Sequence, residues 1–450
     1  MNSTAPKSAE SRIVDYFSGR YGWVILIVGV IGVIMSSPGQ TYSVSIFLEH
    51  IREDLGINRT TISLMYTIGT VTGSFMLPII GRQLDVRGPR LMMILTAVLF
   101  GLACFYMGWV RNAAMLAIGF VGIRMLGQGS TSLISRQMVN LWWVERRGTI
   151  LGIMIFASAL LGPGSFPILI NWLIPQYGWR VTYPILGGLV VLVMVPVAFF
   201  FYRGRPELFG LLPDARGKIS EAIAAKQEEP AESEDELSAD LHLSAEDLVE
   251  EENWTLGQVA RTGTFWLILL AIVSFDMLGT GVSFHIVSIF TDAGLSADLA
   301  AAYYFPMSIM SAVVALSGGF LIDRIEPKYM LSFGLFVQAI SYAVATIMGT
   351  PAMALAFVIL RGLNGGLART LANVLWPKYY GRDNLGVISG FATTFGVIGS
   401  GLGPLIYGFG RDISTSYTPV LWITAVMPLV LGVAVLFLQK PSLKDIESVS

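Results

Sequence analysis

Four ionisable side chains lie deep inside long apolar stretches of this sequence: Arg124, Arg361, Asp276 and His285. An ionised group near the centre of a bilayer is costly unless it has a partner or faces water, so such residues usually have a function. Two arginines at matching depth in two apolar runs could attract an anion. A buried aspartate could hold a proton and release it when an arginine becomes available. The pattern predicts a net-positive central site in which Arg124 and Arg361 bind an anion, while Asp276 and His285 couple binding to protons.

Uncharged polar residues in the same runs are further candidates for binding through hydrogen bonds. These candidates are Gln40, Tyr42, Gln128, Tyr303 and Asn364. Tyr303 could equally belong to an aromatic belt at the outer membrane interface, and His285 could lie in an outer vestibule. Arg136 and Arg369 lie nearer one end of their runs, where long cationic side chains reach for water. We interpret these two arginines as anchors or as an electropositive inner mouth.

A short polar stretch between two apolar runs, Gly81–Arg90, recurs later in the chain as a weaker copy, Gly319–Lys328. The first glycine, the aspartate and the final cation recur at an offset of 238 positions, and Arg124 and Arg361 repeat at an offset of 237. Two separate features that repeat at nearly the same offset indicate that the two halves of the chain arose by duplication. The stretch is too polar for lipid and short enough to predict a tight turn. We expect its residues to form a cytoplasmic gate, made of Gly81, Asp85, Arg87, Gly88, Arg90 and Asp323.

Twelve apolar runs are long enough to cross a hydrocarbon core about 30 Å thick. They lie at roughly 21–48, 60–82, 90–110, 113–141, 148–175, 180–202, 263–291, 299–322, 328–349, 351–376, 386–410 and 418–438. Only helices and closed barrels satisfy their backbone in lipid, and long runs without alternation favour helices. We therefore predict an all-α membrane protein with twelve transmembrane helices in two pseudo-symmetric six-helix bundles.

Charge is scarce and unevenly distributed along the chain. Of the 450 residues, 54% are hydrophobic and 13% are charged, whereas about a quarter of a soluble domain is charged. Acidic residues gather between positions 203 and 262, in a composition that cannot bury a core. The predicted divisions are an N-terminal tail (1–20), a first bundle (21–202), an acidic linker (203–262), a second bundle (263–438) and a C-terminal tail (439–450).

The distribution of lysine and arginine predicts the orientation of the helices. With both termini in the cytoplasm, the cytoplasmic connections other than the linker hold nearly three times as many of these cations as the outer connections. Such a bias is typical of membrane proteins, in which positive loops stay inside. We expect an integral membrane protein with cytosolic tails and a cytosolic linker, in contact with the lipid bilayer and monomeric.

The pattern G-x-x-x-D-x-x-G-x-R at Gly81–Arg90 resembles the signature loop between helices 2 and 3 of the major facilitator superfamily. Three stretches, Tyr21–Val24, Gly39–Val44 and Trp376–Arg382, resemble the bacterial monocarboxylate transporter and oxalate/formate exchanger branch. This resemblance implies a small carboxylate substrate, moved with protons or in exchange, across a bacterial inner membrane. In the superfamily the arginine of helix 4 often bonds to neighbouring backbone or polar groups. The resemblance therefore also leaves a structural role open for Arg124.

These observations predict a secondary active transporter of a small organic anion, a mono- or dicarboxylate, that works by alternating access between two bundles with proton symport or anion exchange. A proton-coupled exporter of amphipathic compounds and a membrane sensor that does not transport remain alternatives. The sequence has no phosphate-binding loop of the Walker type, and its three histidines and one cysteine, Cys104, are too few for a metal site. We expect no enzymatic activity, no cofactor, no metal and no nucleic-acid partner.

Overall fold

The structure is a computed structural model that describes residues 20–143, 146–215, 254–322, 324–381 and 385–441. Within these ranges, twelve helical segments are long and apolar enough to cross a membrane, six between Tyr21 and Phe201 and six between Gly263 and Leu436. The expected all-α class and the two sets of six spans are confirmed. The bounds of the individual divisions of the chain remain a prediction.

The first bundle contains spans that are broken as well as continuous helices. It consists of α2 (Tyr21–Met35), η2 (Ser37–Gly39), α3 (Thr41–Leu55), α4 (Arg59–Phe75), α5 (Leu77–Met107), α6 (Ala113–Ile123), η3 (Arg124–Thr131), α7 (Ser132–Trp142), α8 (Arg147–Leu161), α9 (Phe166–Tyr177) and α10 (Trp179–Phe201). The first span is α2 followed by α3, the fourth is α6 with η3 and α7, and the fifth is α8 with α9.

The second bundle has longer uninterrupted helices. It consists of α14 (Gly263–Phe284), α15 (Ile286–Asp292), α16 (Ala297–Ile322), α17 (Pro327–Thr346), α18 (Pro351–Tyr380), α19 (Leu385–Ser414) and α20 (Thr418–Leu436), preceded by the single turn α13 (Leu256–Val259). The fourth span of this bundle, α18, is a regular α-helix, whereas its counterpart in the first bundle contains η3, which is a π-helix.

The break in the first span lies at Pro38, which has no backbone N–H to continue the helix. The hydroxyl groups of Ser36 and Ser37 donate hydrogen bonds to the carbonyl oxygens of Val33 and Ile34, at 2.6 and 2.5 Å. These bonds give a second partner to carbonyl groups that also accept backbone N–H bonds at the end of α2. The break ends at Gly39, so the next helix starts in the middle of the span.

The expected tight turn at Gly81–Arg90 is confirmed: the second span ends at Leu84, the third begins at Val86, and α5 is two helices that meet at a kink. Helical geometry continues on both sides of Gly88, which alone breaks it with φ 77° and ψ 161°. Glycine adopts this conformation at little cost, and Pro89 is suited to the first turn of the helix that follows, so no loop is needed. Arg87 is exposed, and the guanidinium of Arg90 lies 4.4 Å from the ring centre of Phe199 in the same bundle. The side chain of Asp85 and all of Asp323 lie outside the described part.

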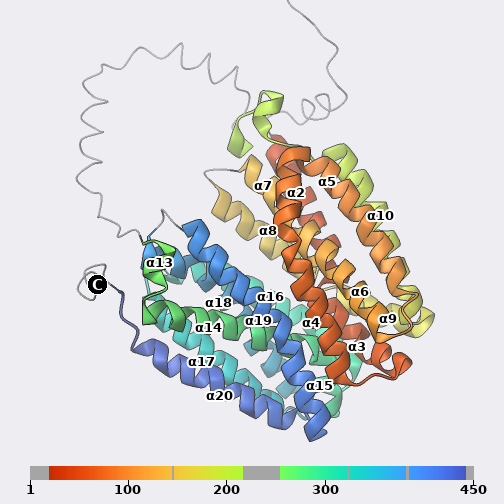
Figure 1. Cartoon of the computed structure of the whole chain (residues 1–450), viewed down its shortest axis with the longest axis vertical. Helices are drawn as coiled ribbons and strands as arrows, with labels where there is room; N and C mark the ends of the chain where they lie inside the picture. The colour runs from red at the N-terminus through yellow and green to blue at the C-terminus, as the bar shows by residue number, and fades with distance from the viewer. Residues whose placement is uncertain (1–19, 144–145, 216–253, 323, 382–384, 442–450) are drawn as a thin grey trace, which may run out of the picture.

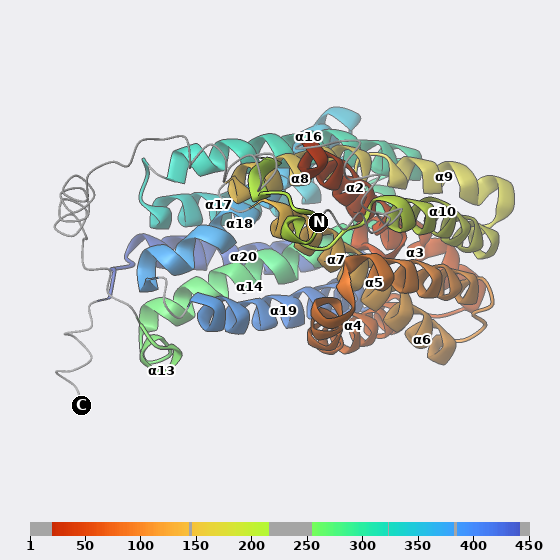
Figure 2. The same ribbon diagram turned by 90° about the horizontal axis from the view of Figure 1, so that it is seen from above.

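The two bundles meet at one end and diverge toward the other, as Figure 1 shows. We call the end that carries Phe201 and Gly263, between which the linker runs, the linker side, and the opposite end the far side. In the view from above, most of the second bundle lies on the left and most of the first on the right, and the two overlap in the middle (Figure 2).

Hydrogen bonds join the two bundles toward the far side. Two of them connect Thr67 with the carbonyl oxygen of Gly401 at 2.6 Å, and Asn171 with Asp298 at 2.5 Å. The others connect Ser45 with Tyr304, Thr60 with Asp412, Ser63 with His285 and Ser288 with Glu49. The far side is therefore closed.

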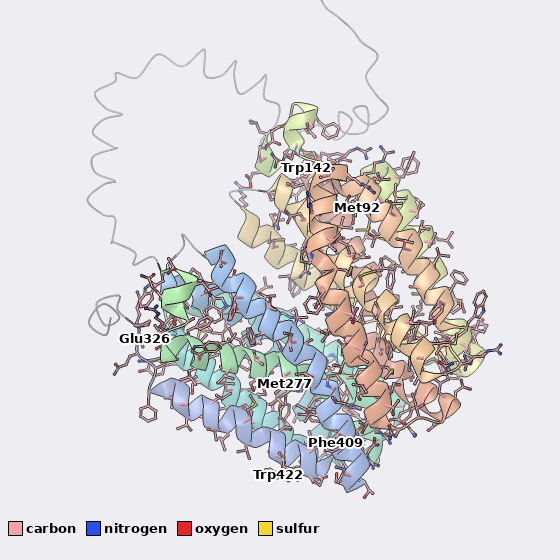
Figure 3. All side chains as sticks on the ribbon, viewed as in Figure 1. Met92, Trp142, Met277, Glu326, Phe409 and Trp422 are labelled. Carbon is pink, nitrogen blue, oxygen red and sulfur yellow. The ribbon has the colours of Figure 1, made fainter. Side chains whose placement is uncertain are left out.

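Large apolar side chains cover the outer surface of both bundles. Phe409 and Trp422, labelled in Figure 3, are 56% and 52% exposed. A soluble protein would not leave so many such residues in water. The surface instead suits a hydrocarbon environment.

The described ends of the linker pack on the bundles that they adjoin. Trp142 donates a hydrogen bond from Nε1 to the carbonyl oxygen of Gly204 at 2.6 Å. Trp254 is fully buried, and its backbone N–H donates to the carbonyl oxygen of Tyr380 at 3.2 Å. Residues 216–253, which hold most of the acidic stretch, lie outside the described part, so its role as a tether stays a prediction.

Candidate functional site

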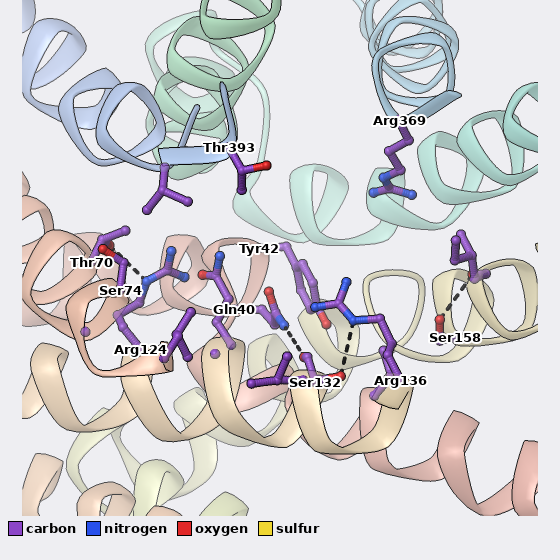
Figure 4. A pocket seen from close by; sticks show the side chains of 18 of the residues that line it. Gln40, Tyr42, Thr70, Ser74, Arg124, Ser132, Arg136, Ser158, Arg369 and Thr393 are labelled. Atoms are coloured by element: carbon purple, nitrogen blue, oxygen red, sulfur yellow. Dashed lines mark hydrogen bonds between the residues drawn. The ribbon is translucent and has the colours of Figure 1, made fainter. Parts of the chain in front are cut away.

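A cavity of about 630 Å³ lies between the two bundles, from the middle of the spans toward the linker side. Its walls come from the first, second, fourth and fifth spans of the first bundle and from α18 and α19 of the second. The polar residues that line it are Gln40, Tyr42, Thr70, Ser74, Arg124, Gln128, Ser132, Arg136, Ser158, Arg369 and Thr393 (Figure 4). Three of the lining residues are arginines, and none in the described part of the chain is acidic.

The π-helix η3 determines which residues of the fourth span face the cavity. Arg124, Gln128, Ser132 and Arg136 all line it, at intervals of four. On a regular α-helix, residues twelve apart would point about 120° away from each other. A π-helix holds more residues in each turn, so the chain rotates less per residue and residues four apart come closer into line. The irregular winding thus places Arg124 and Arg136 on the same cavity wall.

Arg124 is 3% exposed and ties three spans together. Its Nε donates to Thr70 Oγ1 at 3.0 Å, and its Nη1 donates to the carbonyl oxygen of Gly39 at 3.0 Å. The guanidinium carbon lies 4.6 Å from the centre of the Tyr66 ring, a cation–π contact. Among the described residues, however, Nη2 finds no hydrogen-bond partner. Arg124 therefore holds three spans together, and it keeps one buried donor without a hydrogen-bond partner among the described residues beside the cavity.

Arg136 and Arg369 approach each other from opposite bundles in Figure 4. Arg136 comes from α7, where its Nε donates to the carbonyl oxygen of Ser132 at 3.2 Å, and Arg369 comes from α18. Sequence reasoning treated both as anchors or as an inner mouth and did not include them among the anion ligands. The repeat of polar residues at positions 124, 128, 132 and 136 was the signal that could have identified Arg136.

Gln40, Tyr42 and Gln128, all expected to bind substrate, line the cavity. Gln40 donates from Nε2 to Ser36 Oγ at 2.9 Å, and the Tyr42 hydroxyl shares a hydrogen bond of 2.8 Å with Ser37. Both partners belong to the broken segment of the first span, which holds these two side chains in place. The Oε1 atom of Gln128 is buried without a hydrogen-bond partner in the described part of the chain.

Arg361 and Asn364 lie inside the second bundle, away from the lining of this cavity. Arg361 Nη2 donates to the carbonyl oxygen of Gly279 at 3.0 Å, and Nη1 donates to Asn364 Oδ1 at 3.2 Å. Asn364 Nδ2 in turn donates to the carbonyl oxygen of Gly334 at 3.0 Å. Arg361 thus joins α18 to α14 as Arg124 joins the fourth span to the first.

Tyr303 and Asp276 also lie outside the cavity lining. The hydroxyl of Tyr303 donates to the carbonyl oxygen of Pro351 at 3.1 Å on the far side. Asp276 has an exposed side chain on α14, next to Gly396 of α19. No hydrogen bond of Asp276 occurs among the described residues, so its carboxylate is not tied to the scaffold.

His285 is fully buried where the bundles meet, between α14 and α15. Its Nε2 lies 3.2 Å from Ser63 Oγ of the first bundle and 3.0 Å from the carbonyl oxygen of Pro404. Its Nδ1 lies 3.0 Å from the hydroxyl of Tyr417. The structure thus places His285 within the far-side contact rather than in the cavity.

Three bacterial transporters resemble this chain over most of its length. A gallate transporter of Pseudomonas putida is 22% identical over 445 residues, covering 92% of this chain and 92% of its own. A 4-hydroxybenzoate transporter of Acinetobacter baylyi is 21% identical, covering 89% of this chain and 88% of its own. An oxalate:formate antiporter of Oxalobacter formigenes is 20% identical, covering 85% and 84%.

A solved structure and a family model agree with these relatives. The inward-facing, occupied structure of a bacterial homologue of the human lysosomal transporter Spinster has a TM-score of 0.69 at 14% identity and covers 94% of this chain and 98% of that chain. The model described as Major Facilitator Superfamily matches residues 29–404. With twelve spans in two bundles around a shared cavity, these matches confirm the resemblance of the Gly81–Arg90 motif: the chain belongs to the major facilitator superfamily.

Proposed function

We propose that this protein moves a small organic anion, a mono- or dicarboxylate, through the cavity between its bundles by secondary active transport. The observation that carries the proposal is the charge of the cavity, which three arginines and no described acidic residue line. A cavity of this composition raises the local concentration of anions and disfavours cations. Its volume of about 630 Å³ lies within the range of about 300–1,000 Å³ that is typical of small-molecule sites.

Arg136 and Arg369 are the residues that we propose bind the anionic group. Two like charges that face each other across a cavity repel, and an anion between them replaces this repulsion by two attractions. At about 4 Å and an effective dielectric constant of 20, each attraction is worth roughly 4 kcal/mol before desolvation. Because the two arginines belong to different bundles, a bound anion also draws the bundles together on the linker side.

This closure gives alternating access a physical cause. In the present state the far side is held shut by hydrogen bonds between the bundles, and the cavity extends toward the linker side. Binding favours closure of the linker side, and the far-side contacts must then break to release the anion. We propose that the linker side is cytoplasmic, in a bacterial inner membrane, and that the Gly81–Arg90 segment forms a gate there.

The relatives support a carboxylate substrate, because gallate, 4-hydroxybenzoate, oxalate and formate are all carboxylates. We further propose that Asp276 couples transport to protons, since its carboxylate has no hydrogen bond among the described residues and lies in an apolar span. His285 would respond to protons only when the far-side contact opens. Exchange of two anions without protons is the other mode that the cavity permits.

Uptake into proteoliposomes tests the proposal. A panel of mono- and dicarboxylates is offered with and without a pH gradient, to the natural protein and to Arg136→Gln and Arg369→Gln. We expect saturable uptake or exchange of at least one carboxylate, and apparent affinity lowered about 10- to 100-fold in each variant, as loss of one hydrogen bond to a charged group implies. Arg111→Gln, which removes an exposed arginine on the far side and outside the cavity, is the control for lost charge. The proposal fails if no anion is carried, or if both cavity variants behave as the control does.

A further inference from the structure

Two polar groups on the cavity wall lack hydrogen-bond partners within the described residues. One is Nη2 of Arg124, a donor on a side chain that is 3% exposed, and the other is Oε1 of Gln128, an acceptor. Both residues line the cavity and both belong to the π-helix η3. Residues four apart on a helix are neighbours, so the donor and the acceptor lie on adjacent parts of the same wall.

Buried polar groups without partners are uncommon in folded proteins, and each requires an explanation. The other nitrogens of Arg124 are bonded to Thr70 and Gly39, so the side chain is held while Nη2 remains free. Gln128 has no such tie among the described residues, although a membrane protein normally satisfies its polar groups internally. A donor and an acceptor left open side by side in a cavity wall match a group on a ligand that both accepts and donates.

A hydroxyl group has this complementarity, because its oxygen accepts a hydrogen bond and its proton donates one. A carboxylate at the same place would accept from Arg124 but would meet the Gln128 oxygen with a second acceptor. A methyl or ring C–H would leave both protein groups unsatisfied. The two open atoms therefore select a neutral hydroxyl over an anionic or an apolar group.

We infer that the cavity takes hydroxylated organic acids, with the carboxylate between Arg136 and Arg369 and a hydroxyl group at Arg124 and Gln128. This inference rests on the proposed function and specifies its substrate class. The two poles are separated along the fourth span by twelve residues, at most about 18 Å of helix. The arginine side chains shorten that distance, yet the hydroxyl must still lie several bonds from the carboxylate. A hydroxyl on the carbon next to the carboxylate would not reach.

Matched acids test the inference. Binding of benzoate, 4-hydroxybenzoate and terephthalate is measured by calorimetry on the full chain in detergent, for the natural protein and for Gln128→Leu. The three acids share a ring and a carboxylate and differ only in the opposite substituent. We expect 4-hydroxybenzoate to bind at least tenfold tighter than either other acid, because a site built to bond a hydroxyl discriminates against ligands that lack it. In Gln128→Leu the preference over benzoate should fall to less than threefold.

Benzoate affinity in Gln128→Leu reports whether that variant is folded, and it should change by less than threefold. Ser130→Ala is the matched control in the same π-helix, since Ser130 bonds to the carbonyl oxygen of Met125 and does not line the cavity. Ser130→Ala should keep the preference of the natural protein for 4-hydroxybenzoate over benzoate. Equal binding of benzoate and 4-hydroxybenzoate, tighter binding of terephthalate, or an unchanged preference in Gln128→Leu overturns the inference alone. Failure of all three acids to bind also overturns the inference, whereas the proposed function fails only if the wider panel of carboxylates is not carried either.

Discussion

Asp412 of α19 caps a helix of the other bundle, which makes it a suitable residue with which to test closure of the far side. Its Oδ2 accepts hydrogen bonds from the backbone N–H of Thr60 at 2.8 Å and from Thr60 Oγ1 at 2.7 Å. Thr60 lies in the first turn of α4, where N–H groups have no partner within the helix and the helix dipole favours a negative charge. Opening of the far side must break both bonds. Asp412→Ala should therefore favour the state in which this side is open.

The size of the effect follows from the type of bond and its exposure. A hydrogen bond to a charged group is worth about 1.5–3 kcal/mol when water is excluded. Asp412 is exposed, so screening by water and salt reduces the combined contribution of its two hydrogen bonds to the closed state to about 1–2 kcal/mol. Since 1.4 kcal/mol is a factor of ten, the ratio of closed to open molecules should fall about 5- to 30-fold. High salt, which shortens the Debye length to about 3 Å at 1 M, should move the natural protein in the same direction.

Distances between spin labels measure this equilibrium. Labels at Arg111 of the first bundle and Ile347 of the second, both exposed residues near the far ends of their spans, report the separation of the bundles. The single native cysteine, Cys104, is buried and does not compete for label. We expect a second, longer distance in Asp412→Ala. Asp54→Ala is the control, because Asp54 pairs with Arg180 at 2.5 Å within the first bundle. An unchanged distance distribution in Asp412→Ala, or the same change in the control, would refute the reasoning.

Three further substitutions probe packing, coupling and the linker. Gly39→Ala should lower the free energy of unfolding by about 1–3 kcal/mol, and with it the melting temperature, because a Cβ would collide with the carbonyl oxygen of Ile123. An unchanged melting temperature would contradict this. Asp276→Asn should abolish uptake driven by a pH gradient while exchange continues, and undiminished uphill uptake removes this residue from coupling. Trp142→Phe should cost about 1 kcal/mol in a thermal melt through the lost bond to Gly204, with substrate affinity unchanged; altered affinity would imply contact with the site.

Hydrophobicity alone was sufficient to predict the fold. A run that crosses a bilayer has few choices of backbone structure, so twelve apolar runs indicated twelve helices and an all-α class. Length and composition do not depend on how helices pack, which is why this part of the prediction was reliable. The tight turn of Gly81–Arg90 could be predicted for the same reason, because a polar stretch between two spans must lie outside the lipid, and its glycine Gly88 has the positive φ of a sharp turn.

The depth of the buried charges could be predicted, but not the direction in which each one faces. Arg124 and Arg361 repeat at one period, and the structure gives them matching contacts, to the carbonyl oxygens of Gly39 and Gly279. Duplication of a half-chain preserves contacts that hold the scaffold together, and the matching contacts of Arg124 and Arg361 are of this kind. The cavity pair Arg136 and Arg369 does not share that period, so symmetry between the halves gave no indication of it.

The direction of a side chain on a helix depends on how the helix is wound between that residue and a reference point. Sequence periodicity assumes regular winding, and the π-helix η3 departs from it between Arg124 and Arg136. Its sequence, RMLGQGST, contains two glycines and two hydroxyl residues but no feature that specifies a π-helix. Ser130 and Thr131 bond to carbonyl oxygens five residues earlier, a pattern that becomes visible only with coordinates.

The wider turns of η3 also affect how this protein tolerates insertions and deletions. Removal of one residue between Arg124 and Thr131 would let the segment relax to an ordinary α-helix, in which Arg136 would follow Arg124 by eleven residues, or about 1,100°, within about 20° of three full turns. Arg136 would then stay on the cavity wall, whereas relaxation to an α-helix without the deletion would turn it about 120° away. In alignments of the two halves, or of distant homologues, a one-residue gap at this place would accordingly mark an ordinary α-helix that presents the same wall.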